Sequence, residues 1–249
     1  MKFLFIIAHK YYRKYESFIE FYINNINTFY NDDADILIVD NNSTHYQDIE
    51  DKVSKYNNVT FIINTSDSKF ELGAYRFGIN YLGDKIKEYE YIVFSQDTFV
   101  LKNKYDFNNL IINDVKATTV LAHHEYYNEE KPFYLYNDEI KAILQQINMY
   151  NKLDKILLCC CSTFILHNST IDNFMKFTNH IKLTIRKDSE IGERYLGRIL
   201  YELNNDKIFY IDGYMGDLKY CRHNTDMYPF LNGYNFQKKL QQKDELTLD

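Results

Sequence analysis

The chain has 249 residues, of which 45% are hydrophobic and 26% charged, with 8 Gly and 2 Pro. This composition excludes disordered, collagen-like and low-complexity proteins, and the length suits one α/β domain with a sizeable core. Asp and Glu (35) outnumber Lys and Arg (29), so the formal net charge is −6. That sign disfavours nucleic acid as a partner, because nucleic-acid binding relies on neutralising phosphates.

The cysteines and the apolar runs indicate the cellular compartment of the protein. Cys159, Cys160 and Cys161 are consecutive within an apolar run, a spacing that suits neither a disulfide ladder nor a CxxC metal site. They are therefore interpreted as buried thiols in a reducing compartment. No apolar run reaches the roughly 20 residues of a membrane span, and the run at the start is too short for a signal peptide. We expect no transmembrane segment and a cytoplasmic location.

The first hundred residues alternate between predicted strands and helices. Four continuous apolar runs end in polar residues, as strands buried in a parallel sheet do; they are 2–9, 35–44, 59–65 and 90–95. Three helices are predicted between them: one carrying Phe18, Tyr22, Ile26 and Phe29, one at 46–56, and one that starts at Ser66 to Ser68 and carries Tyr75, Ile79, Leu82 and Ile86. This order predicts βαβ units, so residues 1–100 are interpreted as a nucleotide-binding half.

The second half alternates less regularly. Strands are predicted at 118–123, 156–166 and 207–212, and helices at 140–147, from Ser169 to about Ile181, and at 191–203. There is no internal repeat and no Pro/Gly/Ser-rich linker. We therefore expect one α/β domain over residues 1–236 and a polar C-terminal tail at 237–249.

Polar residues follow the predicted strands at the points where ligands bind in open α/β sheets. These positions are His9, Asp40, Ser66-Asp67 and Gln96-Asp97. A carboxylate after the second strand can accept hydrogen bonds from a ribose or a base, and one after the fourth can hold a divalent cation against a diphosphate. Neither GxGxxG after the first strand nor GxxxxGK[ST] is present, so the phosphates must be neutralised in another way.

Four segments resemble landmarks of the family-2-like GT-A glycosyltransferases. Residues 39–44 (VDNNST) are similar to that family's VDNxS(T/D) segment, and residues 71–79 (ELGAYRFGI) resemble its N-x-G-x-A-x-N-x-G-I helix. Residues 92–100 (IVFSQDTFV) fall where the family carries the strand end with its DxD motif. Residues 189–194 (SEIGER) resemble the segment that holds the catalytic base. These landmarks occur in the family's order.

The resemblance implies a single GT-A (Rossmann-like) domain, with a mostly parallel central sheet flanked by helices, and a nucleotide-sugar-dependent hexosyltransferase. The residues it places near a UDP-sugar donor are Ala8, His9, Asp40, Asn42, Ser43, Arg76, Gln96 and Asp97. Residues 101–236 would be the acceptor-binding half. Glu193 would be the catalytic base, and His123, His124 and Glu190 would line the site of a glycan or glycoprotein acceptor. Asp97 and His223 would hold Mn²⁺ or Mg²⁺.

The chain departs from the family pattern at two places. The first DxD carboxylate is absent, because residues 95–97 are Ser-Gln-Asp and residues 97–99 are Asp-Thr-Phe. A single carboxylate binds Mg²⁺ or Mn²⁺ weakly unless diphosphate oxygens, water and another ligand complete the shell. In addition, Glu71 stands where the family's helix usually has Asn.

Several of these residues have simpler interpretations. Asp40 and Asp97 are also suited to close Asx turns at strand ends. Glu190 and Arg194 have the i,i+4 spacing of a surface ion pair, which favours Glu193 over Glu190 as the base. His123 and His124 lack a partner at metal-ligand spacing, so a structural or rim position is the alternative to the acceptor site.

The expected reaction is transfer with inversion, since the sequence offers a base and no obvious second nucleophile. Two other functions fit parts of the pattern. A sugar-phosphate nucleotidyltransferase has a similar sheet, but usually needs a Gly-rich loop after the first strand, where this chain has HKYYRK at 9–14. A catalytically silent nucleotide-sugar or carbohydrate-binding module would explain the incomplete DxD motif.

Overall fold

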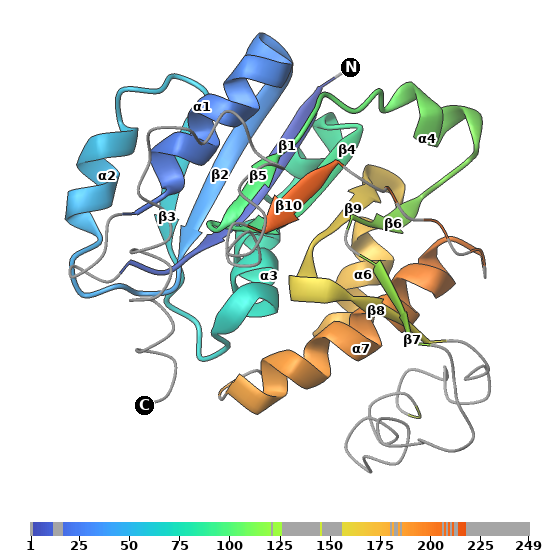
Figure 1. Cartoon of the computed structure of the whole chain (residues 1–249). Helices are drawn as coiled ribbons and strands as arrows, with labels where there is room; N and C mark the ends of the chain where they lie inside the picture. The colour runs from blue at the N-terminus through green and yellow to red at the C-terminus, as the bar shows by residue number, and fades with distance from the viewer. Residues whose placement is uncertain are drawn as a thin grey trace.

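A computed structural model of the chain provides the fold (Figure 1). The structure describes residues 2–11, 17–120, 122–125, 145, 156–179, 181, 184, 186–205, 207, 209, 211 and 214–217. Every structural statement below refers to these residues.

The centre of the domain is a six-stranded sheet in the order β3-β2-β1-β4-β9-β6 (Figure 1). Its strands are β1 (Phe3–His9), β2 (Ala34–Asp40), β3 (Val59–Ile63), β4 (Tyr91–Gln96), β6 (Ala117–Thr119) and β9 (Phe164–His167). The first four are parallel to one another, and β9 runs antiparallel to both β4 and β6. The fold class expected from the sequence is therefore confirmed: a single α/β domain with a mostly parallel central sheet.

Helices cover both faces of this sheet, which gives three layers (Figure 1). The helices are α1 (Ile19–Tyr30), α2 (Gln47–Val53), α3 (Phe70–Leu82), α4 (Asn108–Ile112), α6 (Ile171–Thr178) and α7 (Arg186–Leu203). Alternate residues of each strand point to opposite faces. In β1, Phe5 and Ile7 pack in the layer with α1, α2 and α4, whereas Leu4 and Ile6 pack in the layer with α3, α6 and α7. Two hydrophobic cores therefore hold the strands in place and fix the positions of their carboxyl ends.

Two short pairs of strands lie beside the main sheet. Antiparallel β5 (Phe99–Leu101) and β10 (Met215–Asp217) form one pair, and β7 (Ala122–Glu125) and β8 (Ile156–Cys159) form the other. Strand β5 directly follows β4 in the chain, so this first pair lies next to the carboxyl end of β4. None of the described helices is long and apolar enough to cross a membrane.

The predicted elements of the first hundred residues are all present, and one begins later than expected. The helix predicted from Ser66 begins at Phe70. The reason is local: the main-chain N–H and the hydroxyl of Ser66 both donate to Asn64 Oδ1, which folds residues 64–68 into a loop. Asn64 is fully buried, so this loop is held against the sheet.

The second half differs more from the prediction. The strand predicted at 156–166 is interrupted at Cys161 and Ser162, whose φ angles of 53° and 49° lie in the left-handed region, so it divides into β8 and β9. The strand predicted at 118–123 likewise divides into β6 and β7. The described residues of 207–212 form no strand, and β10 is found at Met215–Asp217 instead.

Other expectations for this half fall partly outside the described residues. The helices predicted at 169–181 and 191–203 correspond to α6 and α7. In the segment 140–147 only Gln145 is described, and it is helical; the tail at 237–249 is outside the described part. The boundaries of the two halves and of the domain remain predictions.

Candidate active site

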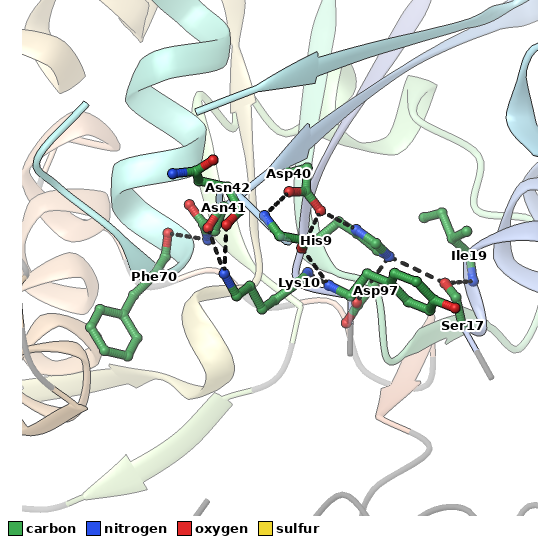
Figure 2. Close-up of polar contacts among 11 residues, drawn as sticks. His9, Lys10, Ser17, Ile19, Asp40, Asn41, Asn42, Phe70 and Asp97 are labelled. Carbon is green, nitrogen blue, oxygen red and sulfur yellow. Dashed lines mark hydrogen bonds and ion pairs between the residues drawn. The ribbon is translucent and has the colours of Figure 1, made fainter. Parts of the chain in front are cut away.

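The carboxyl ends of the three neighbouring strands β2, β1 and β4 bring His9, Asp40 and Asp97 together (Figure 2). His9 and Asp40 are the last residues of β1 and β2 and are register partners. Asp97 follows β4 directly, and its main-chain N–H donates to the carbonyl of Ala8 at 3.1 Å. Three residues that are 31 to 88 positions apart in the sequence thus share one edge of the sheet because parallel strands end on the same side.

Asp40 is fully buried, and both of its carboxylate oxygens accept hydrogen bonds. The main-chain N–H of Ser43 donates to Oδ1 at 2.6 Å, and the Ser43 hydroxyl donates to Oδ2 at 2.7 Å. His9 Nδ1 lies 2.8 Å from the same Oδ2, which places the proton of this pair on Nδ1. Burial by itself raises the pKa of Asp40, but the bonds from His9 and Ser43 outweigh it and the net pKa is below the usual value. Asp40 is therefore a buried carboxylate.

This geometry matches the simpler interpretation of Asp40, in which it closes an Asx turn. The main-chain N–H of Asn42 donates to the Asp40 carbonyl at 2.8 Å, and Asn42 has a φ of 58°. Asp40 and Ser43 therefore shape the loop after β2 and orient His9. A direct contact of Asp40 with a donor nucleotide remains a prediction.

The other ring nitrogen of His9 faces the end of β4 (Figure 2). His9 Nε2 lies 3.2 Å from the Ser17 hydroxyl and 3.7 Å from Asp97 Oδ2. The imidazole is fully buried, whereas the side chain of Asp97 is 13% exposed. The Lys10 main-chain N–H also donates to Asp97 Oδ2, at 3.4 Å. Asp97 is therefore the carboxylate of this group that reaches the surface.

Sequence reasoning did not assign Lys10 to the donor site, yet its side chain links two strand ends. Its ammonium group donates to the carbonyls of Asn41 at 2.9 Å and Asn42 at 3.0 Å (Figure 2). Partial burial lowers the pKa of Lys10. The only signal in the sequence was its position directly after an apolar run. The structure thus places a cationic group beside the loop that Asp40 shapes.

Glu193 reaches the same region through the turn between β8 and β9. Gln96, the last residue of β4, donates from Nε2 to the carbonyl of Cys161 at 3.0 Å. The main-chain N–H of Cys161 donates in turn to Glu193 Oε1 at 3.0 Å. Glu193 lies on α7 and is partly exposed. The predicted base is therefore two hydrogen bonds away from the residue that precedes Asp97.

Arg76 makes contacts that the sequence did not indicate. It lies on α3, and its guanidinium donates to the main-chain carbonyls of Thr178 and Ile181, at the carboxyl end of α6. Burial lowers the pKa of Arg76. Thr178 is the last residue of α6 and Ile181 lies three positions beyond it; the Thr178 carbonyl also accepts from the Ile181 main-chain N–H. The contacts give Arg76 a role in joining α3 to α6, and its expected contact with the donor remains a prediction.

The structure describes less of the predicted acceptor site. His123 and His124 lie on β7 opposite Leu158 and Leu157 of β8, and Glu190 lies on α7, but the side chains of these three candidates are outside the described part. His223 is outside it entirely. Their assignments remain predictions. Cys159 is buried and Cys161 is partly exposed, so the interpretation of the cysteines as core residues holds for Cys159.

The described residues do not by themselves form a binding set for a divalent cation. Within the described part, no group of three or more His, Cys, Asp or Glu side chains is placed to hold a metal ion. Asp97 is the one predicted ligand that is described, and the two nitrogens of nearby His9 already face Asp40 and Ser17. A hard cation prefers several oxygen ligands, so this set does not fit Mn²⁺ or Mg²⁺.

Comparison with known proteins found no matching family model and no matching curated protein. Three solved structures illustrate the similarities that were found. 4-Diphosphocytidyl-2C-methyl-D-erythritol synthase from Anaerococcus prevotii is 13% identical with a TM-score of 0.48, over 84% of this chain and 86% of that one. Residues 1–349 of TarS from S. aureus in complex with UDP are 14% identical with a TM-score of 0.47, over 100% and 71%. The mannosyltransferase PcManGT from Pyrobaculum calidifontis, in complex with GDP-Man and Mn²⁺, is 13% identical with a TM-score of 0.45, over 98% and 69%.

Glycosyltransferases, the class that the sequence resemblance indicates, are thus among the proteins whose structures are similar to this one. A nucleotide-handling synthase is among them as well. Because the identities are 14% or lower and the TM-scores are below 0.5, these similarities do not establish a function.

Proposed function

We propose that the protein is a glycosyltransferase that moves a sugar from a nucleotide-sugar donor, a UDP-sugar, to a hydroxyl of a glycan or glycoprotein. The observation that carries the proposal is the arrangement at the carboxyl edge of the sheet. His9, Asp40 and Asp97 meet there, and two hydrogen bonds, from Gln96 to Cys161 and from Cys161 to Glu193, link Glu193 to the end of β4. A donor in this position would have its nucleotide over β1 and β2 and its sugar near the end of β4.

In the proposed reaction Glu193 acts as the general base. Its carboxylate takes the proton of the acceptor hydroxyl while that oxygen forms a bond to the anomeric carbon of the donor sugar. The bond between the anomeric carbon and the diphosphate oxygen breaks, and the nucleoside diphosphate leaves with the electron pair. Attack and departure on opposite faces invert the configuration of the anomeric carbon.

The N–H of Cys161 has a specific effect on this base. It donates to Oε1 of Glu193 and so holds one oxygen of the carboxylate in place. Such a bond also stabilises the charged form of the carboxylate. The left-handed conformation of Cys161 and Ser162 directs the amide toward α7. The turn therefore orients the proposed base relative to the end of β4.

The divalent cation expected from the sequence has one described candidate ligand, Asp97. The described residues do not make up a cation site, so no step of the proposed reaction uses a cation.

The test compares two substitutions on the same helix, Glu193→Gln and Glu190→Gln. Release of UDP is measured from a panel of UDP-sugars, and binding of UDP is measured by calorimetry. We expect Glu193→Gln to bind UDP as the wild type does and to lose at least about a hundredfold in rate, the typical contribution of a general base. Glu190→Gln should lower kcat much less than Glu193→Gln does, because its predicted place is at the acceptor site and not at the reacting oxygen. A Glu193→Gln protein that transfers sugar at the wild-type rate would contradict the assignment.

The same assays separate the proposal from its two alternatives. UDP binding without turnover of any UDP-sugar supports a binding module. Release of pyrophosphate from a nucleoside triphosphate in the presence of a sugar phosphate supports a nucleotidyltransferase.

A further inference from the structure

Two lysines at the carboxyl edge of the sheet are held by carbonyls rather than by carboxylates. Lys10 donates to the carbonyls of Asn41 and Asn42, and Lys69 donates to those of Ser66 at 2.7 Å and Asn64 at 3.3 Å. Both side chains are partly buried. Across the described residues, neither of these ammonium groups has an ion pair with Asp or Glu. Both ammonium groups therefore keep their charge without a carboxylate beside them to neutralise it.

One asparagine connects the two lysines. The carbonyl of Asn41 accepts from Lys10, and its side-chain Oδ1 accepts from Asn64 Nδ2 at 2.9 Å. The carbonyl of Asn64 in turn accepts from Lys69. The two ammonium groups are also close enough that the charge of Lys69 contributes to the lowered pKa of Lys10. The network therefore holds two like charges near each other, which costs free energy unless an anion lies between them.

A third positive feature points to the same place. Lys69 is the N-cap residue of α3, a helix of 13 residues, and makes no side-chain capping bond to it. The first N–H groups of a helix carry a partial positive charge and favour anions. Asn41 Nδ2 donates to the Phe70 carbonyl at 3.1 Å, which fixes this helix start beside the loop after β2 (Figure 2).

Carboxylates nearby offset part of this charge. The attraction of Asp40 raises the pKa of Lys10 by more than Lys69 lowers it, but Asp40 is buried and hydrogen-bonded to His9 and Ser43. Glu71 lies in the first turn of α3. Asp97 accepts the main-chain N–H of Lys10, on the side of the residue away from the loop after β2 (Figure 2).

We propose that Lys10, Lys69 and the start of α3 form a binding site for a diphosphate group, the part of the donor whose charge must be neutralised. The inference rests on the proposed function for the identity of the ligand, a nucleoside diphosphate, but its chemistry requires only a polyphosphate anion. It also supplies the neutralisation for which the sequence showed neither a P-loop nor a complete DxD motif.

The test measures binding of UDP, uridine and inorganic pyrophosphate to the full chain by calorimetry, in EDTA so that no free metal bridges the anion. The variants are Lys10→Gln and Lys69→Gln. The matched control is Lys85→Gln, an exposed lysine in the 3-10 helix Gly83–Glu88, before the amino end of β4. We expect each site variant to lower the affinity for UDP and for pyrophosphate about tenfold or more, as loss of a charged hydrogen bond does. The affinity of the site variants for uridine should change less than twofold, and so should the affinity of the control for all three ligands.

The outcomes separate this site from the proposed function. Pyrophosphate that binds the wild type and is lost in both variants supports the site even if no sugar is transferred. UDP and pyrophosphate affinities that stay within twofold in both variants overturn the site, even if the wild type transfers sugar. Equal weakening of uridine and UDP also overturns it, because the lysines would then act through the structure of the loop. Absence of any pyrophosphate binding to the wild type overturns it as well.

Discussion

His9 and Asp40 form a fully buried pair, with Nδ1 and Oδ2 2.8 Å apart, that joins the carboxyl ends of two neighbouring parallel strands. Each residue is the last of its strand, and the two are register partners. Because Asp40 also holds the loop after β2 through Ser43, the pair determines the shape of the region in which the donor is proposed to bind.

Removing the charge of Asp40 should destabilise the protein in a pH-dependent way. The Asp40→Asn variant loses a carboxylate that accepts three hydrogen bonds, and we expect a loss of about 2–3 kcal/mol in the free energy of unfolding at pH 7. The pKa of Asp40 in the folded state lies below its ordinary value of 3.8, so this stabilisation is present above that pH and is lost as the pH falls below it. Urea unfolding from pH 7 to pH 3 measures the difference.

The difference in the free energy of unfolding between the wild type and Asp40→Asn should therefore become smaller below about pH 3.8. The exposed Asp51→Asn, on α2, is the control and should change stability by less than about 0.5 kcal/mol. A difference that stays constant from pH 7 to pH 3 would contradict the view of Asp40 as a charged partner of His9.

The two glycines of α3 should respond differently to alanine. A Cβ on Gly73 would lie 2.3 Å from the main-chain oxygen of Ser68, whereas one on Gly78 would lie 3.1 to 3.2 Å from the tips of three aliphatic side chains. Alanine in a helix is otherwise favoured by about 1 kcal/mol. We expect Gly73→Ala to lose about 2 kcal/mol or more and to weaken UDP binding, because it displaces the loop that carries Lys69. Gly78→Ala should stay within about 1 kcal/mol of the wild type.

Thermal unfolding and UDP titration of both glycine variants check this expectation. Equal stability of Gly73→Ala and the wild type would show that the loop before α3 is not packed as described.

Substitution of Arg76 should affect folding more than binding. Its partly buried guanidinium donates to the carbonyls of Thr178 and Ile181, at and just after the end of α6, so Arg76→Met should lower the free energy of unfolding by about 2–3 kcal/mol. If these contacts are its main role, UDP affinity should change less than twofold below the unfolding temperature. A large loss of UDP affinity with unchanged stability would instead support the donor contact that the sequence resemblance implied.

Gln96 should act through the turn that holds Glu193. The Gln96→Leu variant keeps a similar side-chain volume but loses the bond to the Cys161 carbonyl. We expect kcat to fall by at least about tenfold with UDP affinity unchanged, because the proposed base is displaced while the nucleotide site is not. Steady-state kinetics and UDP titration measure the two effects. A loss of UDP affinity with an unchanged kcat would instead make Gln96 a donor contact.

The positions of the strand ends could be predicted from the sequence because parallel strands buried on both faces are continuous apolar runs. His9, Asp40 and Asp97 were found in this way, since each follows such a run. The break at Cys161 and Ser162 could not be found, because three cysteines in an apolar run resemble an uninterrupted strand and neither residue is one that favours a positive φ.

Contacts between distant segments could not be predicted from the sequence either. The partners of Arg76 lie 102 and 105 residues away and are main-chain carbonyls, which leave no mark on the side-chain pattern. The late start of α3 has a similar cause. Serine is a good capping residue, but the hydroxyl and the main-chain N–H of Ser66 both donate to the side chain of Asn64. The buried side chain of Asn64 therefore determines where the loop ends and where α3 begins, against the local preference of Ser66.

An NMR titration of the labelled full chain with UDP locates the nucleotide directly. Two sets of main-chain amides are compared, one at the carboxyl edge of the sheet (His9, Asn41 and Asp97) and one at its amino edge (Lys2, Asp35 and Glu90). The account predicts saturable shifts at the first set and none at the second. Shifts confined to the amino edge, or no shift at millimolar UDP, would contradict it.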